Sequence, residues 1–283
     1  MIFRDDLLKD KVVLVTGGAT GLGRAMSEAF GSLGAKLALV GRRQAVLDDA
    51  ARDLQEKNME VWVQSVDIRD ADAVDTMMDA VFRHYGKLDV LVNNAAGNFI
   101  SPTERLSPRA VDAILNIVLH GTFYCTLAAG KRWIARTDPG TVLNIVTTYA
   151  WTGSGYVSPS AAAKAGVLAL TRSLAVEWAP HNIRQVAIAP GPFPTPGAWS
   201  RLLPTPELAR AALDRVPLGR VGQPEELTTL AAYLISDAAS YINGEVITID
   251  GGEWLKGAGM FNMMERVTPD QWDSIRAMMP RKS

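Results

Sequence analysis

The stretch that most constrains the fold is a short apolar run followed at once by a glycine-rich turn. Residues 12–15 are Val, Val, Leu and Val, a run typical of a buried parallel strand. Gly17, Gly21 and Gly23 follow, and apolar residues then recur at helical spacing from Arg24 to Gly34. A strand, a glycine-rich turn and a helix place a helix N-terminus where it can bind a phosphate. The pattern therefore predicts a nucleotide site, and the alternative is a tight turn without a ligand.

Apolar strand patterns alternate with helical patterns along most of the chain. We expect strands at 12–15, 36–40, 61–66, 88–92, 141–146, 183–188 and 246–249, and helices at 24–34, 44–57, 71–85, 107–135, 158–178 and 224–236. This alternation predicts an α/β fold over residues 1–283: a single-domain, Rossmann-type, doubly wound parallel seven-stranded sheet with helices on both faces. A C-terminal extension is expected from about residue 253 to 283. Ligands of such sheets bind at the carboxyl ends of the strands.

Composition excludes several classes of function. The 283 residues are 48% hydrophobic, which is enough for one large core, and a net charge of −1 offers no field for nucleic acid or an anionic membrane. The single cysteine, Cys125, cannot form an intrachain disulfide, and three scattered histidines give no zinc spacing. We find no signal-peptide pattern and no apolar run of about 18 residues, and so expect no membrane span. A bacterial chain would be cytoplasmic, and a processed eukaryotic chain would lie in the mitochondrial matrix.

Basic and acidic residues follow the second and third expected strands. Arg42 and Arg43 stand where an acidic residue often meets a ribose hydroxyl, and two guanidinium groups suit a 2′-phosphate instead. This favours NADPH over NADH, although a solvated basic turn has the same pattern. Asp67 is placed to accept a hydrogen bond from an adenine amino group, or else caps the next helix.

Amide, phenol and amine side chains follow the fourth and fifth strands. Asn98 could donate a hydrogen bond to a substrate oxygen, or simply form a turn. Ser160 and Lys164 share one helix face, and an ammonium group near a phenol favours its ionised form. Tyr149 could reach that face, and Tyr156 is the competing phenol in the same loop. In the alternative interpretation these are solvated or rim residues.

Together these motifs resemble the short-chain dehydrogenase/reductase family, over about residues 7–272. The resemblance rests on the glycine motif, on Asn-Asn-Ala-Ala-Gly at 93–97, on the Tyr/Ser/Lys segment and on Pro-Gly-Pro at 190–192. The family usually has tyrosine where Ser160 stands and serine near Thr147. One subgroup has this chain's arrangement: residues 94–108 resemble the mitochondrial-type 2,4-dienoyl-CoA reductases almost letter for letter, and these also place tyrosine fifteen residues before the lysine.

The resemblance implies a role for each matching position. Tyr149 would be the catalytic acid, with Asn98 beside it on the thioester oxygen, Ser160 in their hydrogen-bond network, and Lys164 on the nicotinamide ribose. Cofactor contacts are implied for Gly17, Thr20, Gly21, Leu22, Gly23, Arg42, Arg43, Asp67, Ile68, Asn94, Ala95, Ala96, Lys164, Pro190, Gly191, Pro192 and Phe193. Acyl-CoA contacts are implied for Arg69, Phe99, Ser107 and Arg201.

The implied activity is NADPH-dependent reduction of a 2,4-dienoyl-CoA to a 3-enoyl-CoA in the β-oxidation of unsaturated fatty acids. A 2-enoyl-CoA or 3-ketoacyl thioester reductase of the same fold is the nearest alternative, and a non-catalytic NADP-binding protein is a further one. The family implies a homo-oligomer, a tetramer, built on helices such as 107–135 and 158–178. Thr268-Pro269-Asp270 predicts the start of a last helix whose apolar face would include Trp272, Ile275 and Met279. That helix would cover the acyl site or a neighbouring subunit.

Overall fold

A computed structural model describes residues 4–195 and 205–278 and contains one seven-stranded sheet. The strand order is β3-β2-β1-β4-β5-β6-β7, and every neighbouring pair is parallel. This confirms the predicted doubly wound α/β sheet and all seven expected strands. Their bounds are β1 Val12–Thr16, β2 Lys36–Gly41, β3 Val61–Ser65, β4 Val90–Asn93, β5 Gly140–Ile145, β6 Ile183–Pro190 and β7 Val246–Ile249.

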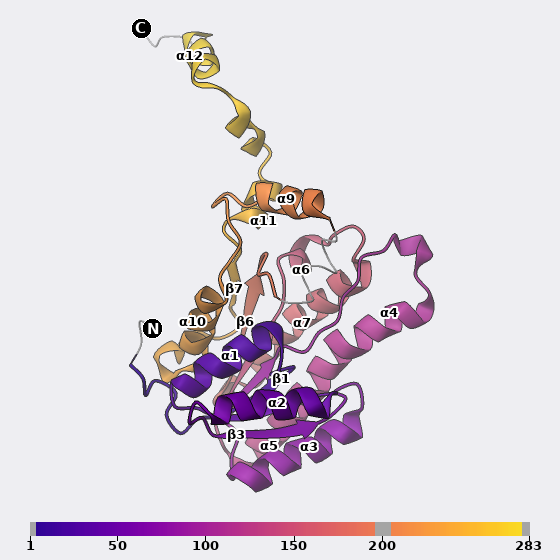
Figure 1. The fold of residues 1–283 in the computed structure, drawn as a ribbon, viewed down its shortest axis with the longest axis vertical. Helices are drawn as coiled ribbons and strands as arrows, with labels where there is room; N and C mark the ends of the chain where they lie inside the picture. Colours follow the sequence, from indigo (N-terminus) through magenta and orange to yellow (C-terminus); the bar gives the residue numbers. More distant parts are fainter. Residues whose placement is uncertain (1–3, 196–204, 279–283) are drawn as a thin grey trace.

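Helices cover both faces of this sheet (Figure 1). Alternate strand residues point to opposite faces, so Val13 and Val15 join a core with α1, α2 and α10, whereas Val12 and Leu14 join one with α3, α5 and α7. The α-helices are α1 Gly21–Ser32, α2 Gln44–Gln55, α3 Ala71–Tyr85, α4 Pro108–Leu115, α5 Gly121–Arg136, α6 Tyr149–Thr152, α7 Ser158–Glu177, α9 Pro206–Asp214, α10 Pro224–Ile235, α11 Glu253–Ala258 and α12 Pro269–Met278. Short 3₁₀ or π turns are η1 Thr103–Arg105, η2 Asn116–His120, η3 Ala179–His181, η4 Asp237–Ala239 and η5 Asn262–Arg266.

The helix expected over 107–135 is interrupted by a π-helical turn, η2, between α4 and α5. Its first residue after the turn, Gly121, packs so closely on Ile68 that a Cβ would lie 2.7 Å from that side chain. The segment Pro108–Arg136 is also apolar enough to cross a membrane, with a mean hydropathy of 1.4 in its best window. It is not the uninterrupted run of about 18 apolar residues that the sequence is expected to lack, because Asn116, His120 and Thr122 interrupt it. Half of that window is buried inside the structure, as in the core helices of proteins without membrane spans.

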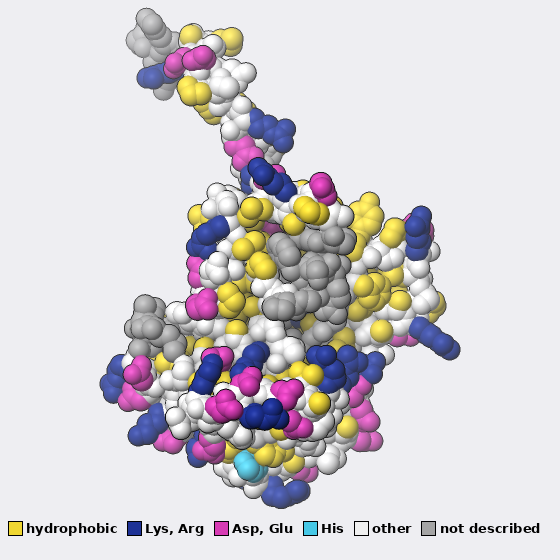
Figure 2. All heavy atoms as spheres, in the orientation of Figure 1, with side chains coloured by type: hydrophobic (Ala, Val, Ile, Leu, Met, Phe, Trp, Pro, Cys, Tyr) yellow, Lys and Arg dark blue, Asp and Glu magenta, His cyan; other side chains and the backbone are white. Residues whose placement is uncertain are grey.

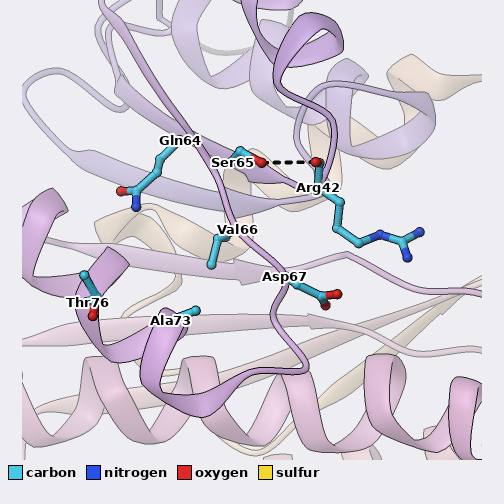
Figure 3. A pocket seen from close by; sticks show the side chains of 7 residues that line it. All are labelled: Arg42, Gln64, Ser65, Val66, Asp67, Ala73 and Thr76. Carbon is cyan, nitrogen blue, oxygen red and sulfur yellow. Dashed lines mark hydrogen bonds between the residues drawn. The ribbon is translucent and has the colours of Figure 1, made fainter.

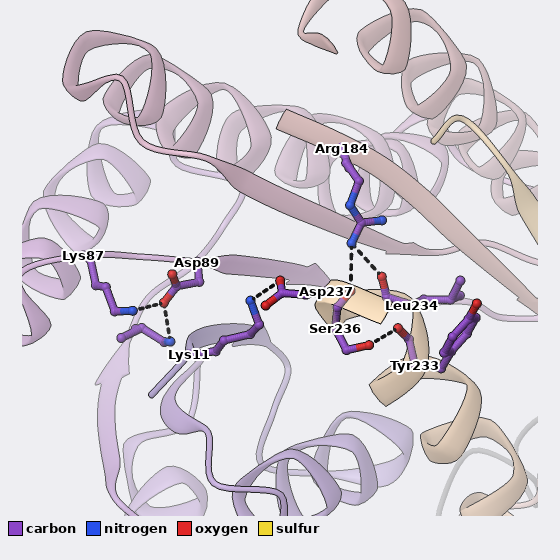
Figure 4. Close-up of polar contacts among 9 residues, drawn as sticks. Lys11, Lys87, Asp89, Arg184, Tyr233, Leu234, Ser236 and Asp237 are labelled. Carbon is purple, nitrogen blue, oxygen red and sulfur yellow. Dashed lines mark hydrogen bonds and ion pairs between the residues drawn. The ribbon is translucent and has the colours of Figure 1, made fainter. Parts of the chain in front are cut away.

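Ion pairs and side-chain hydrogen bonds hold the amino ends of the strands together (Figure 4). Asp89 accepts from the Val12 backbone N–H at 2.7 Å and pairs with Lys87 at 2.9 Å. Lys11 reaches Asp237 at 2.8 Å, and Arg184 donates to backbone carbonyls of the α10–η4 connection. The opposite, carboxyl edge of the sheet carries the polar residues singled out in the sequence.

The C-terminal segment from α11 to α12 extends away from the body of the molecule (Figure 1). Thr268 and Gln271 cap the start of α12, which begins at Pro269 as the sequence predicts. Met260 and Phe261 are about three-quarters exposed and Trp272 is 46% exposed, so this arm presents apolar side chains to solvent. Met279 lies outside the described residues. Figure 2 shows apolar atoms on the arm and interspersed basic and acidic side chains on the visible face around α2.

Candidate active site

The glycine-rich turn after β1 forms the floor of the site. Gly17 and Gly21 have φ values of 65° and 55°, a region that glycine adopts readily. A Cβ on Gly23 would lie 2.3 Å from the Gly17 carbonyl oxygen, so only glycine fits there. Asn94 Nδ2 donates to the Thr16 carbonyl at 2.9 Å and ties β4 to this turn. The turn therefore leaves the N-terminus of α1 accessible to a phosphate, as the sequence predicts.

A cleft of about 760 Å³ runs along the carboxyl edge of the sheet. It brings together the predicted cofactor residues and the predicted catalytic residues, which come from loops after β1, β2, β3, β4, β5 and β6. The members that line it are Gly17, Thr20, Leu22, Arg42, Arg43, Asp67, Ile68, Asn94, Ala95, Ala96, Asn98, Tyr149, Ser160, Lys164, Pro190 and Gly191. Pro192 and Phe193 line an adjoining hollow of about 90 Å³ instead. A long cleft with a glycine turn at its floor fits a dinucleotide.

A second hollow, of about 470 Å³, opens beside Arg42 and Asp67 (Figure 3). Arg69 donates to Asp67 Oδ1 at 2.9 Å, and this hydrogen bond keeps the pKa of the Asp67 carboxyl below its usual range. Gln64 also lines the hollow, and its side-chain oxygen is buried without a partner among the described residues. Gln64 was not among the predicted site residues; its signal in the sequence is a single amide after three apolar residues of β3. These polar groups fit a flat ring with amino and ring-nitrogen edges.

Three side chains form a hydrogen-bonded cluster deeper in the cleft. Tyr149 is the first residue of α6, which follows β5 after residues 146–148, and its hydroxyl lies 3.1 Å from Ser160 Oγ on α7. Asn98 Nδ2 donates to the same hydroxyl at 3.4 Å. Asn98 Oδ1 accepts from the Phe99 backbone N–H at 2.9 Å, which turns the amide nitrogen toward the phenol. The cluster therefore places two donors, an amide and a phenol, at one point of the cleft.

Lys164 lies one helical turn beyond Ser160 on the same face of α7. It is buried and donates to the Ile145 backbone carbonyl at the end of β5. Burial lowers the pKa of this amine to about 8, so it remains largely charged at neutral pH. Tyr156, the competing phenol, is 64% exposed with a φ of 65°, whereas Tyr149 lies in the cluster. The geometry thus favours Tyr149 between the two tyrosines.

The predicted acyl-CoA residues are more scattered. Phe99 is 37% exposed next to the cluster, and its neighbour Ile100 is 50% exposed. Ser107 caps α4, accepting from the Ala110 N–H at 3.2 Å, and Arg69 is held by Asp67. Arg201 lies outside the described residues. The cleft wall also includes Ile117 from η2, which the sequence analysis did not single out because no apolar pattern marks a π turn.

Comparisons with known proteins agree with this geometry. A family described as "Enoyl-(Acyl carrier protein) reductase" matches residues 17–253. A Bacillus subtilis protein named "Probable 2,4-dienoyl-CoA reductase", described as producing (2E)-enoyl-CoA, is 45% identical over 88% of this chain and 98% of its own length. A Caenorhabditis elegans protein named "Probable 2,4-dienoyl-CoA reductase 3", described as producing (3E)-enoyl-CoA, is 41% identical over 97% of this chain and 91% of its own length.

Solved structures share the fold. A short chain dehydrogenase from Bacillus anthracis is 43% identical with a TM-score of 0.80, covering 87% of this chain and 97% of its own. A short-chain type dehydrogenase/reductase from Mycobacterium marinum is 30% identical with a TM-score of 0.81, covering 88% and 98%. One cleft of the parallel sheet holds the glycine turn together with Tyr149, Ser160 and Lys164. From this geometry and these matches, the chain belongs to the short-chain dehydrogenase/reductase family of oxidoreductases.

Proposed function

We propose that this protein reduces a 2,4-dienoyl-CoA to a 3-enoyl-CoA with NADPH, a step in the β-oxidation of unsaturated fatty acids. The observation that carries this is the pairing of the Asn98 amide with the Tyr149 phenol at one point of the cleft. Two donors at one point suit an oxygen that gains negative charge during reaction. The names of the Bacillus and Caenorhabditis relatives support the same substrate class, a 2,4-dienoyl-CoA.

NADPH, when bound in the cleft, would supply a hydride to the far end of the conjugated diene. The pair of electrons displaced there moves to the thioester oxygen, where the Asn98 N–H and the Tyr149 O–H donate hydrogen bonds. Ser160 holds the Tyr149 hydroxyl at 3.1 Å. The Lys164 ammonium would bind the nicotinamide ribose of the cofactor. The Tyr149 hydroxyl then gives up its proton, which adds at the α-carbon as the carbonyl re-forms. The phenolate regains a proton from water, so one hydride and one proton have together reduced one double bond.

The proposed cofactor is NADPH because two arginines close the adenosine end of the cleft. Arg42 and Arg43 line the cleft after β2, and among the described residues neither is in an ion pair. Their guanidinium groups can bind a 2′-phosphate through several hydrogen bonds. A solved structure from Agrobacterium tumefaciens, 31% identical with a TM-score of 0.81, holds bound NADP.

The position of the final proton decides the product. Protonation at the α-carbon gives a 3-enoyl thioester, and protonation at the γ-carbon gives a 2-enoyl thioester. The names of the relatives include both products, (2E)-enoyl-CoA for the Bacillus subtilis protein and (3E)-enoyl-CoA for the Caenorhabditis elegans protein. We propose the 3-enoyl product because the donors on the oxygen leave the α-carbon as the nearest basic carbon.

The test is NADPH oxidation by the purified protein with a 2,4-dienoyl-CoA, beside a 2-enoyl-CoA, a 3-ketoacyl-CoA and NADH. We expect rapid turnover of the dienoyl substrate alone, with NADPH preferred. Turnover only of the 2-enoyl or 3-ketoacyl thioester would refute the dienoyl assignment, and tight NADPH binding without any turnover would indicate a binding protein. Proton NMR of the product locates its double bond.

Tyr149→Phe tests the acid. We expect kcat to fall about 10²–10⁴-fold with little change in NADPH affinity, because a positioned acid contributes that much. Tyr156→Phe is the matched control, since that phenol is 64% exposed. Loss of activity in Tyr156→Phe with normal activity in Tyr149→Phe would mean that the catalytic phenol has been assigned wrongly.

A homo-oligomer, which we propose to be a tetramer, is supported by apolar residues on outer helix faces. Phe123 and Leu127, one turn apart on α5, are 45% and 37% exposed, and Val176 on α7 is 79% exposed. Light scattering of the purified protein measures the number of subunits in the assembly.

Relatives from Arabidopsis, yeast, zebrafish and mouse carry peroxisomal names, which lend no support to a mitochondrial location. We propose a cytoplasmic location if the chain is bacterial.

A further inference from the structure

Two tryptophans far apart in sequence stack beside the catalytic tyrosine. The rings of Trp151 and Trp254 have centroids 5.1 Å apart and an interplanar angle of 23°. Trp151 belongs to α6, the short helix that begins with Tyr149, and Trp254 belongs to α11 at the base of the C-terminal arm. The family match ends at residue 253, so Trp254 lies just beyond it.

The short helix α6 needs an external support. It has only four residues, and one helical turn is unstable by itself. Its Trp151 ring packs against a small core that includes Val146 and Leu168 on one side and stacks on Trp254 on another. Because Tyr149 is two residues away in the same turn, movement of Trp151 would displace the phenol from Asn98 and Ser160.

Trp254 is itself fixed by the end of β7. The two Asp250 carboxylate oxygens accept from the backbone N–H groups of Gly252 and Trp254, each at 2.8 Å. Asp250 also lies against the Pro190–Gly191 turn, where a Cβ on Gly191 would be 2.6 Å from Asp250 Cβ. Gly191 lines the cofactor cleft. One acidic residue therefore connects the cofactor side of the cleft to the tryptophan pair.

We propose that Trp254 is a positioning residue that holds Tyr149 in register with the cofactor through Trp151. The inference deepens the proposed function and rests on it for the role of Tyr149. Stacked aromatic pairs contribute beyond their buried area, and a catalytic group displaced by about an ångström can lose about a hundredfold in rate. Trp254→Ala should therefore lower kcat about tenfold to a hundredfold and leave the KM for the acyl-CoA and the Kd for NADPH within about twofold.

The decisive experiment compares Trp254→Ala in the wild-type and the Tyr149→Phe proteins. If Trp254 acts through the phenol, kcat falls strongly in the wild type and changes little in Tyr149→Phe, because sites that act as a unit are non-additive. Trp254→Phe keeps a stacking ring and should restore most of kcat. Trp62→Phe is the matched control, because Trp62 lies on β3, stacks on His84 and is not part of the cleft lining; it should keep wild-type kcat and KM.

A spectroscopic readout separates this inference from the substrate assignment. A stacked tryptophan pair gives an exciton couplet in circular dichroism, which Trp254→Ala and Trp151→Phe should both remove and Trp62→Phe should keep. Loss of the couplet with unchanged kcat would overturn the positioning role. Equal losses of kcat in the wild-type and Tyr149→Phe backgrounds, or a couplet that survives Trp254→Ala, would also overturn it. Absence of dienoyl-CoA turnover in the wild type, with the couplet intact, would instead refute the proposed substrate.

Discussion

Replacing Arg42 or Arg43 with alanine should weaken the binding of NADPH and leave the binding of NADH unchanged. Both residues follow β2 and line the cleft, with exposed side chains. A hydrogen bond to a charged group contributes about 1.5–3 kcal/mol, and exposure to water favours the lower end of that range. Since about 1.4 kcal/mol corresponds to tenfold in affinity, each single substitution should raise the Kd for NADPH about tenfold.

The double substitution should raise that Kd by less than the product of the two single effects if both groups bind the same phosphate, because residues that share a partner do not act additively. The assay is fluorescence titration with NADPH and NADH in parallel, followed by the ratio of kcat/KM for the two cofactors. Arg52→Ala is the matched control, because Arg52 lies on α2, the helix that follows Arg43, and pairs with Asp49 at 3.2 Å, outside the cleft lining. An unchanged NADPH-to-NADH ratio in both single variants and the double variant would refute the 2′-phosphate assignment.

Three further substitutions test the glycine turn below the cleft, the Lys164 amine and the hydrophobic core. Gly23→Ala should weaken NADPH binding at least about tenfold, because its Cβ would lie 2.3 Å from a backbone oxygen, whereas Gly155→Ala, in open space, should not; calorimetric titration compares them. NADPH binding should weaken as pH rises through about 8, since the Lys164 ammonium is lost there, and Lys164→Met should lack that change in a pH series of Kd. Phe30→Ala, at a fully buried site, should lower the free energy of unfolding by about 3–5 kcal/mol in denaturant titration.

The fold could be predicted from the sequence because each central strand is a short apolar run buried on both faces. Residues 12–15, for example, form β1, whose residues are all buried, within one residue of the expected bounds. The edge strand β7 also matches its expected bounds, 246–249, although only Val246 is buried there. The irregular elements could not be found in this way. The π turn at Asn116–His120 has no apolar signature, and α6 is shorter than the window that reveals helical periodicity. The helix α9 was not predicted, although its sequence carries a signal for a helix start: Thr205 is the N-cap and Pro206 is the first residue.

The choice between the two tyrosines shows where sequence reasoning stops. Tyr149 begins α6 and Tyr156 lies in the connection that follows it. Without the resemblance to the reductase subgroup, the spacing to Lys164 does not separate the two phenols. The structure separates them because α6 turns Tyr149 toward Ser160, while the left-handed backbone at Tyr156 leaves its ring 64% exposed. Such distinctions depend on single backbone dihedral angles, which composition and periodicity do not encode.

Asp67 and Arg69 give the same lesson in electrostatic terms. From the sequence, the Asp67 carboxylate was expected to bind adenine, and the resemblance implied that the Arg69 guanidinium contacts the acyl-CoA, as two separate sites. In the structure they form one ion pair, with Arg42 close enough to lower the pKa of Asp67 further. Because Arg69 neutralises the carboxylate, Asp67 would not repel the 2′-phosphate that we propose for Arg42 and Arg43, and the net charge at this end of the cleft is positive. An acidic residue can thus stand beside a 2′-phosphate site without opposing it.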